Sequence, residues 1–225
     1  KRRRNKLYRL FDQIMATGGS CFFMGDLFDF YFEYPDLIPK SYFDFFEKTK
    51  VLKENGITLY FLAGNHDYWV GDHITNDVMN EVYLDDKQIE INGKKFFLTH
   101  GDGLLSWDHG YRLLKKVIRS KTFIWLFRWL HPTIGYKVAG MISRSGKKNT
   151  HGEDFNEDVR VELQKVAKEH FDNGYDFMIS GHYHLGEMFL IEKGKLVVLG
   201  DWFHRPSYAV FDGEDLELKL WEDDE

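Results

Sequence analysis

Five short segments of the sequence place glycine beside aspartate, asparagine or histidine, residue types that bind metal ions and transfer protons. They are residues 25–29 (Gly-Asp-Leu-Phe-Asp), 64–67 (Gly-Asn-His-Asp), 100–102 (His-Gly-Asp), 181–184 (Gly-His-Tyr-His) and 200–201 (Gly-Asp). Carboxylate, amide and imidazole donors together suit a divalent ion such as manganese, iron or zinc. Each segment alone is typical of an ordinary turn, but the complete set predicts a metal-dependent site.

Each of the five segments follows a short apolar run that is typical of a buried strand. These runs are residues 20–24, 57–63, 95–99, 176–180 and 195–199. In open α/β sheets the carboxyl ends of the strands are where ligands bind, and glycine allows the backbone to turn sharply there. We therefore expect the five segments to meet at one edge of the fold.

The remaining pattern alternates helices with these strands. Helical periodicity covers residues 5–16, 41–55 and 153–173, and Asn-Gly at 92–93 and Lys-Gly at 193–194 indicate hairpins. Residues 208–211 and 216–221 are predicted to form closing strands. Helices that alternate with strands, together with hairpins, predict a layered α/β (α+β) fold with a mixed sheet.

Length, charge and cysteine content exclude several classes of protein. The chain has 225 residues, a formal net charge of −6 and one cysteine, Cys21. This length suits a single domain over residues 1–225. A lone cysteine excludes an internal disulfide and fits a reducing compartment. No apolar run approaches the roughly 20 residues of a membrane-spanning helix, and the net negative charge argues against a general nucleic-acid binder.

Residues 103–150 interrupt the alternation and carry ten Lys/Arg against a single acid, Asp108. We predict that this block is an inserted helical cap. Residues 121–130 are apolar nearly all round, which fits either a buried helical hairpin or a lipid-facing lid whose basic residues meet phosphates or anionic headgroups. Its Leu, Ile and Val side chains suit acyl chains better than stacked bases, so nucleic acid is not the expected partner.

Four of the segments, 25–29, 64–67, 100–102 and 181–184, resemble motif blocks of the calcineurin-like metallophosphoesterases. The resemblance extends over nearly the whole chain. It implies a β-sandwich flanked by helices, with two divalent metal ions where the strands end. Manganese is the expected metal, with iron or zinc as alternatives, and such a pair activates water and holds phosphoryl oxygens.

The resemblance also implies a role for individual residues. Asp26 would bridge both metal ions. Asn65, His100 and His182 would complete the shell of one ion, and His184 would bind the other.

The same resemblance places His66 near the leaving group as an acid or charge stabiliser, oriented by Asp67. A purely structural role for His66 is the alternative. Asp29, Asp102 and Asp201 would hold ligand side chains in place rather than bind metal themselves.

Members of this family begin with a strand that ends in Asp-x-His, and no Asp-x-His precedes Asp26 in this sequence. We expect that N-terminal residues of the natural protein are missing from it. The alternative is a protein that has lost one metal ion. As written, the sequence supplies a complete shell for one ion.

Within the family, the cap resembles that of the UDP-2,3-diacylglucosamine diphosphatases of lipid A synthesis, and so does the His-Gly-Asp segment at 100–102 followed by an Asp and a Tyr. This implies hydrolysis of the substrate's pyrophosphate to UMP and 2,3-diacylglucosamine 1-phosphate. The substrate-binding residues would be Asp108, Tyr111, Arg144, Ser145 and Lys148. For the last three, solvated surface positions are an equal alternative. His66 stands where the best-known members have arginine, which leaves phosphoester hydrolysis intact but the exact substrate open.

We therefore predict a metal-dependent phosphohydrolase that acts on a lipid-linked nucleotide. It would be cytoplasmic and peripheral on the inner face of the cytoplasmic membrane, where the basic, aromatic cap meets an anionic surface. One alternative is a general metallophosphodiesterase or phosphatase that acts on soluble esters. The other is a non-catalytic, membrane-associated metal-binding protein. The sequence does not predict an oligomeric state.

Overall fold

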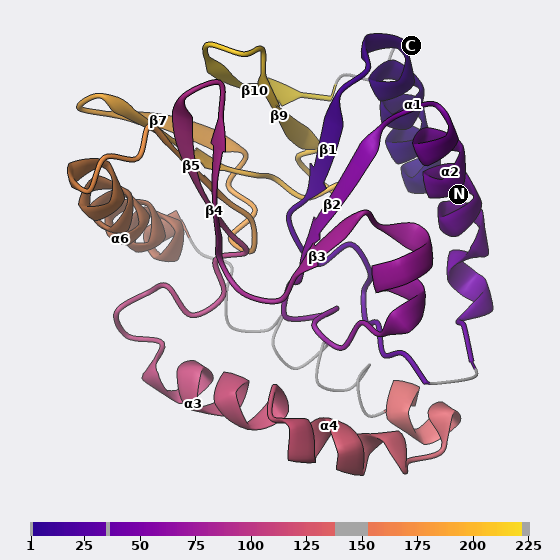
Figure 1. Ribbon diagram of the computed structural model, residues 1–225. Coiled ribbons are helices and arrows are strands. Elements are labelled where there is room, and N and C mark those ends of the chain that lie inside the picture. The colour runs from indigo at the N-terminus through magenta and orange to yellow at the C-terminus, as the bar shows by residue number, and fades with distance from the viewer. Residues whose placement is uncertain (1, 35–36, 138–152, 222–225) are drawn as a thin grey trace.

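The computed structural model describes residues 2–34, 37–137 and 153–221 (Figure 1). Its first two layers are a helical layer and a parallel sheet of order β1-β2-β3. The strands are β1 (Ser20–Phe23), β2 (Thr58–Leu62) and β3 (Glu81–Tyr83). Helices α1 (Arg2–Thr17) and α2 (Phe43–Glu54) cover this sheet, and a 3-10 turn, η1 (Lys40–Tyr42), precedes α2. The layers are held together by a cluster that includes Phe11, Leu52, Leu59 and Phe61.

The second sheet has the order β4-β5-β6-β8-β7 and contains both parallel and antiparallel pairs. Its strands are β4 (Lys87–Ile91), β5 (Lys94–Thr99), β6 (Phe177–Ser180), β7 (Glu187–Ile191) and β8 (Gly194–Val198). Helix α6 (Glu153–Asp172) packs on the outer face of this sheet, where Leu163 and Ala167 are fully buried against Met178 and Leu196. The first hairpin turns at Asn92-Gly93 as predicted, whereas the second turns at residues 192–193, one residue earlier than predicted, because Gly194 already pairs with Ile191.

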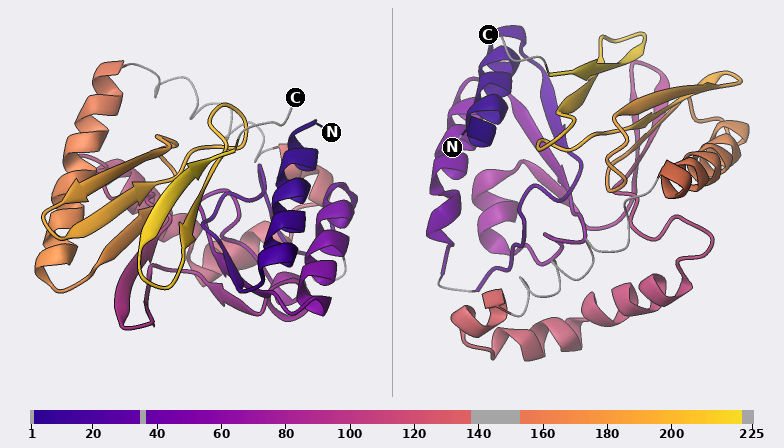
Figure 2. Two further views of the ribbon diagram at one scale, coloured as in Figure 1. Left: turned by 90° about the horizontal axis from the view of Figure 1, so that it is seen from above. Right: turned by 180° about the vertical axis from the view of Figure 1, so that it is seen from behind.

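The inner faces of the two sheets pack against each other (Figure 2). Phe96, Leu98 and Val197 of the second sheet meet Phe22 of β1 and Phe211 of β9 in one cluster. Strands β9 (Ser207–Phe211) and β10 (Leu216–Leu220) form an antiparallel pair. The result is a β-sandwich with helices on both outer sides, which confirms the predicted fold class.

The cap segment lies across the carboxyl ends of the strands (Figures 1 and 2). It contains α3 (His109–Ile118), α4 (Lys121–Arg128) and a further helical turn at residues 132–137. A π-helix, η2 (His73–Val78), connects β2 to β3. Among the helices that the structure describes, none combines the length and the apolar character needed to cross a bilayer.

Candidate metal centre

Three of the predicted ligands converge where three strands end. Asp26 lies beyond β1, His100 beyond β5 and His182 beyond β6, and their ligand atoms all lie within 4.8 Å of one another. Asp26 Oδ2 is 3.3 Å from His100 Nε2. Asn65, which follows β2, places Oδ1 3.1 Å from the same nitrogen. The two sheets therefore deliver an O,O,N,N donor set to one point.

The hydrogen bonds of His100 show which of its nitrogens faces the site. Nδ1 lies 2.8 Å from the Met24 carbonyl oxygen, which is an acceptor only, so Nδ1 carries the proton. In the neutral ring, Nε2 then presents a lone pair to Asp26 and Asn65, as in metal-binding histidines whose other nitrogen donates to a carbonyl. Electron pairs that face one another repel unless a proton or a metal ion lies between them, so the donor set fits a divalent ion that would take the place of the Nε2 proton.

The pKa shifts of Asp26 and His100 also indicate that the site favours positive charge. Burial opposes the charged form of His100, but the Asp26 carboxylate outweighs burial and raises the pKa of His100 to about 9. Burial also opposes the ionisation of Asp26, and His100 nevertheless holds the pKa of that carboxyl well below its usual range. A bound metal ion would displace the His100 proton and take over its role.

Two glycines are required by the close approach of the ligand loops. A Cβ on Gly64 would lie 2.2 Å from Asp26 Oδ1, and a Cβ on Gly25 would lie 2.5 Å from His100 Nδ1. Asp26 and His182 themselves have φ values of 52° and 61°, in the left-handed region that residues other than glycine rarely adopt. Backbone strain of this kind persists where the surrounding structure enforces it, commonly at functional sites.

Asp67 is fully buried and holds the two ligand loops of the first sheet together. Its carboxylate accepts hydrogen bonds from the backbone N–H groups of Gly64 (2.8 Å), Asp26 (3.1 Å) and Leu27 (2.7 Å). Burial, followed by the nearby Asp26 charge, raises the pKa of Asp67 to about 6. The side chain therefore fixes the position of Asp26 through the backbone.

His66 is oriented by a different residue from the one predicted. Its Nδ1 lies 2.8 Å from the backbone carbonyl oxygen of Asp29, while Asp67 directs its oxygens to backbone N–H groups. The expectation that Asp67 orients the His66 ring was wrong, because a carboxylate saturated by the backbone is not free to hold it. His66 Nε2 is 4.0 Å from Asp26 Oδ2, at the edge of the donor set.

The two histidines that follow β6 differ in their surroundings. Burial lowers the pKa of His182 to about 4, so this ring is neutral and able to bind metal near pH 7. His184 is about half exposed and stands outside the Asp26–His100–His182 group. Its Nδ1 is 3.7 Å from Asp201 Oδ2, as expected if Asp201 supports it.

Comparison with known proteins identifies the family. The family model of the calcineurin-like phosphoesterases matches residues 2–186. The protein belongs to the calcineurin-like phosphoesterase family. Membership makes it a hydrolase of phosphoester or pyrophosphate bonds, and the family's dependence on divalent metal ions agrees with the donor set described above.

Several curated relatives of this phosphoesterase are named UDP-2,3-diacylglucosamine hydrolase. The protein of that name from Porphyromonas gingivalis is 33% identical, with 94% of this chain and 87% of the relative aligned. The Histophilus somni protein is 30% identical (88% and 86% aligned), and the Vibrio atlanticus protein is 26% identical (87% and 81% aligned).

In this phosphoesterase, four side chains, Asp26, Asn65, His100 and His182, would hold a divalent ion, which supplies Lewis-acid activation of a phosphoryl group. His66 would hold or deliver a proton at Nε2, because its Nδ1 is engaged by a carbonyl.

The predicted substrate-binding residues fall into two groups. Asp108 immediately precedes α3 and is partly buried, which raises its carboxyl pKa. The Tyr111 ring packs beside His182, with 6.4 Å between the ring centroids. Arg144, Ser145 and Lys148 lie outside the described residues.

Asp102 has partners that sequence reasoning missed. It was expected to hold a metal ligand, but its carboxylate contacts Tyr111, Lys115 and Arg119 of the cap instead. That expectation was wrong, because the Met24 carbonyl already holds His100. The spacing of four residues between Tyr111, Lys115 and Arg119 places them on one face of a helix, and this was the available signal.

Proposed function

We propose that this phosphoesterase hydrolyses the pyrophosphate of UDP-2,3-diacylglucosamine, releasing UMP and 2,3-diacylglucosamine 1-phosphate. One observation carries the proposal: the Asp26–Asn65–His100–His182 donor set lies at the strand ends covered by a basic and apolar cap. The names of relatives that align over most of their length support the same substrate. A lipid-linked nucleotide needs both parts, a centre for the pyrophosphate and a surface for the acyl chains.

The proposal includes two divalent ions, with manganese as the metal. The second ion would be bound by His184, whose Nδ1 lies 3.7 Å from Asp201 Oδ2. Oxygen and imidazole donors without thiolates fit manganese, with iron and zinc as alternatives.

The activity is tested with manganese and UDP-2,3-diacylglucosamine, with UMP and the lipid monophosphate detected by mass spectrometry. We expect both products from the wild type. Loss of a ligand removes several kcal/mol of transition-state stabilisation, so His100→Ala should lower kcat/KM by roughly 10³-fold or more. His131→Ala, which removes an exposed cap histidine, is the matched control and should change the rate less than about twofold.

Cleavage of bis(4-nitrophenyl) phosphate without cleavage of the lipid nucleotide would instead support a general phosphodiesterase. Absence of turnover with either compound would contradict the hydrolytic proposal.

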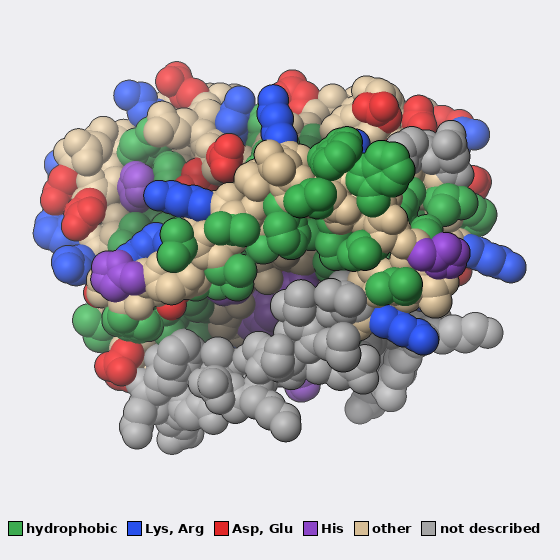
Figure 3. All heavy atoms as spheres, turned by 90° about the horizontal axis from the view of Figure 1, so that it is seen from below, with side chains coloured by type: hydrophobic (Ala, Val, Ile, Leu, Met, Phe, Trp, Pro, Cys, Tyr) green, Lys and Arg blue, Asp and Glu red, His purple; other side chains and the backbone are tan. Residues whose placement is uncertain are grey.

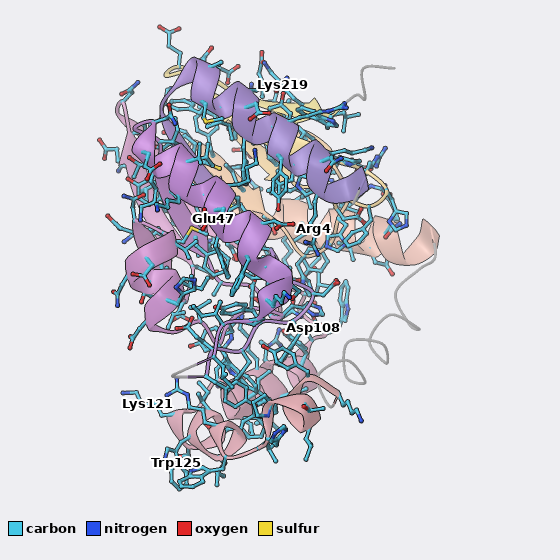
Figure 4. The ribbon with its side chains drawn as sticks, turned by 90° about the vertical axis from the view of Figure 1, so that its right-hand side faces the viewer. Arg4, Glu47, Asp108, Lys121, Trp125 and Lys219 are labelled. Carbon is cyan, nitrogen blue, oxygen red and sulfur yellow. The ribbon has the colours of Figure 1, made fainter. Side chains whose placement is uncertain are left out.

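The outer face of the cap supports a membrane surface as the place of reaction. Seen from below, hydrophobic side chains gather over α3 and α4, with Lys and Arg beside them (Figure 3). The exposed apolar residues there include Leu113, Leu114, Val117, Trp125, Leu126 and Trp129. Trp125 lies at the far edge of the cap, away from the sandwich (Figure 4). Contiguous exposed apolar surface marks an interaction site, and tryptophan favours the bilayer interface.

Exposed cations on the same helices fit an anionic surface. Lys116, Lys121 and Arg128 are all exposed, and each basic residue near anionic lipid contributes about 1 kcal/mol. The occupant that we propose for this face is therefore the anionic inner leaflet of the cytoplasmic membrane, where the substrate's acyl chains reside.

Flotation with vesicles that contain phosphatidylglycerol tests this surface. Leu113→Gln should reduce binding several-fold, because it removes an apolar side chain worth about 1–2 kcal/mol at an interface. Leu190→Gln is the matched control, since Leu190 is similarly exposed but belongs to β7 on the sandwich. Equal binding of both variants and the wild type would contradict the membrane proposal.

A further inference from the structure

Asp102 is a buried carboxylate that receives three side chains from one face of the cap. Tyr111 donates its hydroxyl to Asp102 Oδ2 at 2.9 Å, and Lys115 Nζ lies 2.9 Å from Oδ1. Arg119 reaches Oδ2 at 3.2 Å. Lys115 also donates to the Asp102 backbone carbonyl at 2.9 Å. The three residues span the length of α3, so this single carboxylate contacts the helix from its first turn to its end.

Arg119 extends the cluster to two other strand ends. Its guanidinium lies 4.0 Å above the Tyr68 ring, in the loop that follows β2. It also lies 3.7 Å from the Asp85 carboxylate, just beyond β3. Because Asn65 lies in the same loop as Tyr68, and Asp102 is two residues beyond His100, the end of α3 is joined to segments that carry metal-binding side chains.

Outside the Asp102 cluster α3 has few anchors to the sandwich, one of which is the hydrogen bond from Trp69 Nε1 to the Ile118 carbonyl at its C-terminal end. None of its residues, all of which the structure describes, is buried. Within the described part of the chain, Asp108 at its N-terminus makes no side-chain capping hydrogen bond. Arg112 donates to the carbonyls of Gly103 and Leu105, but these belong to the segment that leads into the helix. The position of α3 over the metal centre therefore depends on the Asp102 cluster.

Burial makes this cluster directional and sensitive to the loss of a partner. The side chains of Asp102, Arg119 and Lys115 are 3%, 12% and 25% exposed. In such a setting charge-assisted hydrogen bonds are strong, and an unpaired charge is costly. Two cations pair with the Asp102 carboxylate, which accepts the Tyr111 hydroxyl hydrogen bond and so fixes the ring that packs beside His182.

We propose that Asp102, Lys115 and Arg119 are positioning residues that set α3 and Tyr111 against the metal centre, so that the cap accepts the sugar–phosphate part of a lipid nucleotide. The proposal rests on the proposed function for its substrate. The cluster acts on substrate binding through the position of the cap, whereas small soluble diesters reach the metal centre without it.

The test compares Lys115→Met with Lys165→Met, which removes the same charge from an exposed position on α6, outside the cap. Three quantities are measured: kcat and KM for UDP-2,3-diacylglucosamine, the rate with bis(4-nitrophenyl) phosphate, and hydrogen exchange of residues 109–119. For Lys115→Met we expect KM to rise about tenfold, with kcat and the diester rate within about twofold. Amide exchange in α3 should accelerate. Lys165→Met should leave all three quantities near wild type.

Lys115→Arg preserves the cation and should restore KM to within about threefold of wild type, which a general packing defect would not allow. Arg119→Met should reproduce the KM effect of Lys115→Met. The proposal is overturned if Lys115→Met matches Lys165→Met in KM and exchange, or if it lowers both activities equally. If the wild type fails to cleave the lipid nucleotide, the proposed function fails, and the exchange comparison alone decides the positioning role.

Discussion

The two cap helices are attached to the same body by different forces. Helix α3 is held by the Asp102 ion cluster and buries none of its fully described residues. Helix α4 buries Phe127, whose ring lies 4.8 Å from both Phe32 and Trp69 between centroids. The loops that carry Asp26 and Asn65 also lead to Phe32 and Trp69, so this aromatic anchor stands on ligand-bearing segments as well.

The difference shows that one inserted segment can be held to the sandwich at one helix and oriented at the other. Aromatic burial is strong but tolerates small shifts, since it depends mainly on area removed from water. Charge-assisted hydrogen bonds fix distance and direction. The two anchors meet where Trp69 Nε1 donates to the Ile118 carbonyl at 2.9 Å, between α3 and α4. We infer that α4 holds the cap on and that α3 aligns it.

Removal of the aromatic anchor should have the largest effect on stability. Phe127→Ala leaves a cavity in the cluster of Phe32, Tyr34 and Phe127, and a buried Phe→Ala substitution costs about 3 kcal/mol or more. Urea denaturation measures the free energy of unfolding. Trp125→Ala, on the exposed side of the same helix, should change it by less than about 0.5 kcal/mol. Similar losses for both variants would show that α4 is not anchored through Phe127.

A smaller loss should follow from removal of one hydroxyl at the same anchor. Tyr34 is nearly buried and donates to the Leu130 carbonyl at 3.0 Å, so Tyr34→Phe should cost about 1 kcal/mol of unfolding free energy. Tyr136 makes a longer contact of 3.5 Å with the Phe32 carbonyl. Tyr136→Phe should therefore be nearly neutral. A larger effect at Tyr136 than at Tyr34 would contradict the geometry described.

The smallest expected effect is that of salt, which should weaken the ionic anchor of α3 but not the aromatic anchor of α4. At 1 M NaCl the screening length is about 3 Å, so the partly exposed side of the Asp102 cluster should weaken. Hydrogen exchange of α3 should accelerate about two- to threefold relative to low salt, a fraction of a kcal/mol. Exchange of α4 should stay constant or slow, because salt does not weaken apolar packing. The Lys115→Met variant should have lost most of this response, whereas equal salt responses of α3 and α4 would contradict the comparison.

The fold could be predicted from the sequence because its signals are local. Apolar runs followed by Gly and turn residues gave the main strands, and Asn92-Gly93 gave a hairpin that forms as expected. The short strand β3 was missed, since three residues carry no periodicity and their pairing with β2 is a tertiary event. The π-helix η2 was missed as well. The Glu33 carboxylate accepts hydrogen bonds from Gly71 and His73 at its start, and this contact spans about 40 residues of chain.

The candidate site divides in the same way. The types and order of Asp26, Asn65, His100 and His182 were evident from strand-end motifs, and the structure brings them together. The partner that orients each side chain was not evident. Asp29 contributes a backbone carbonyl to His66, which a sequence pattern does not display, and Asp102 turned out to serve the cap.

By itself, the sequence determined the inventory of donors, the glycines that let the loops approach, and the amphipathic, basic character of the cap. These are properties of single residues and of spacings within one element. The tertiary structure decided that Asp67 links two ligand loops, that a carbonyl fixes the His100 proton, and that one buried carboxylate aligns α3. A hydrogen bond forms only when donor and acceptor atoms lie within a few tenths of an ångström of about 3 Å from each other, and such distances between segments far apart in the sequence are set when the two sheets and the cap pack together.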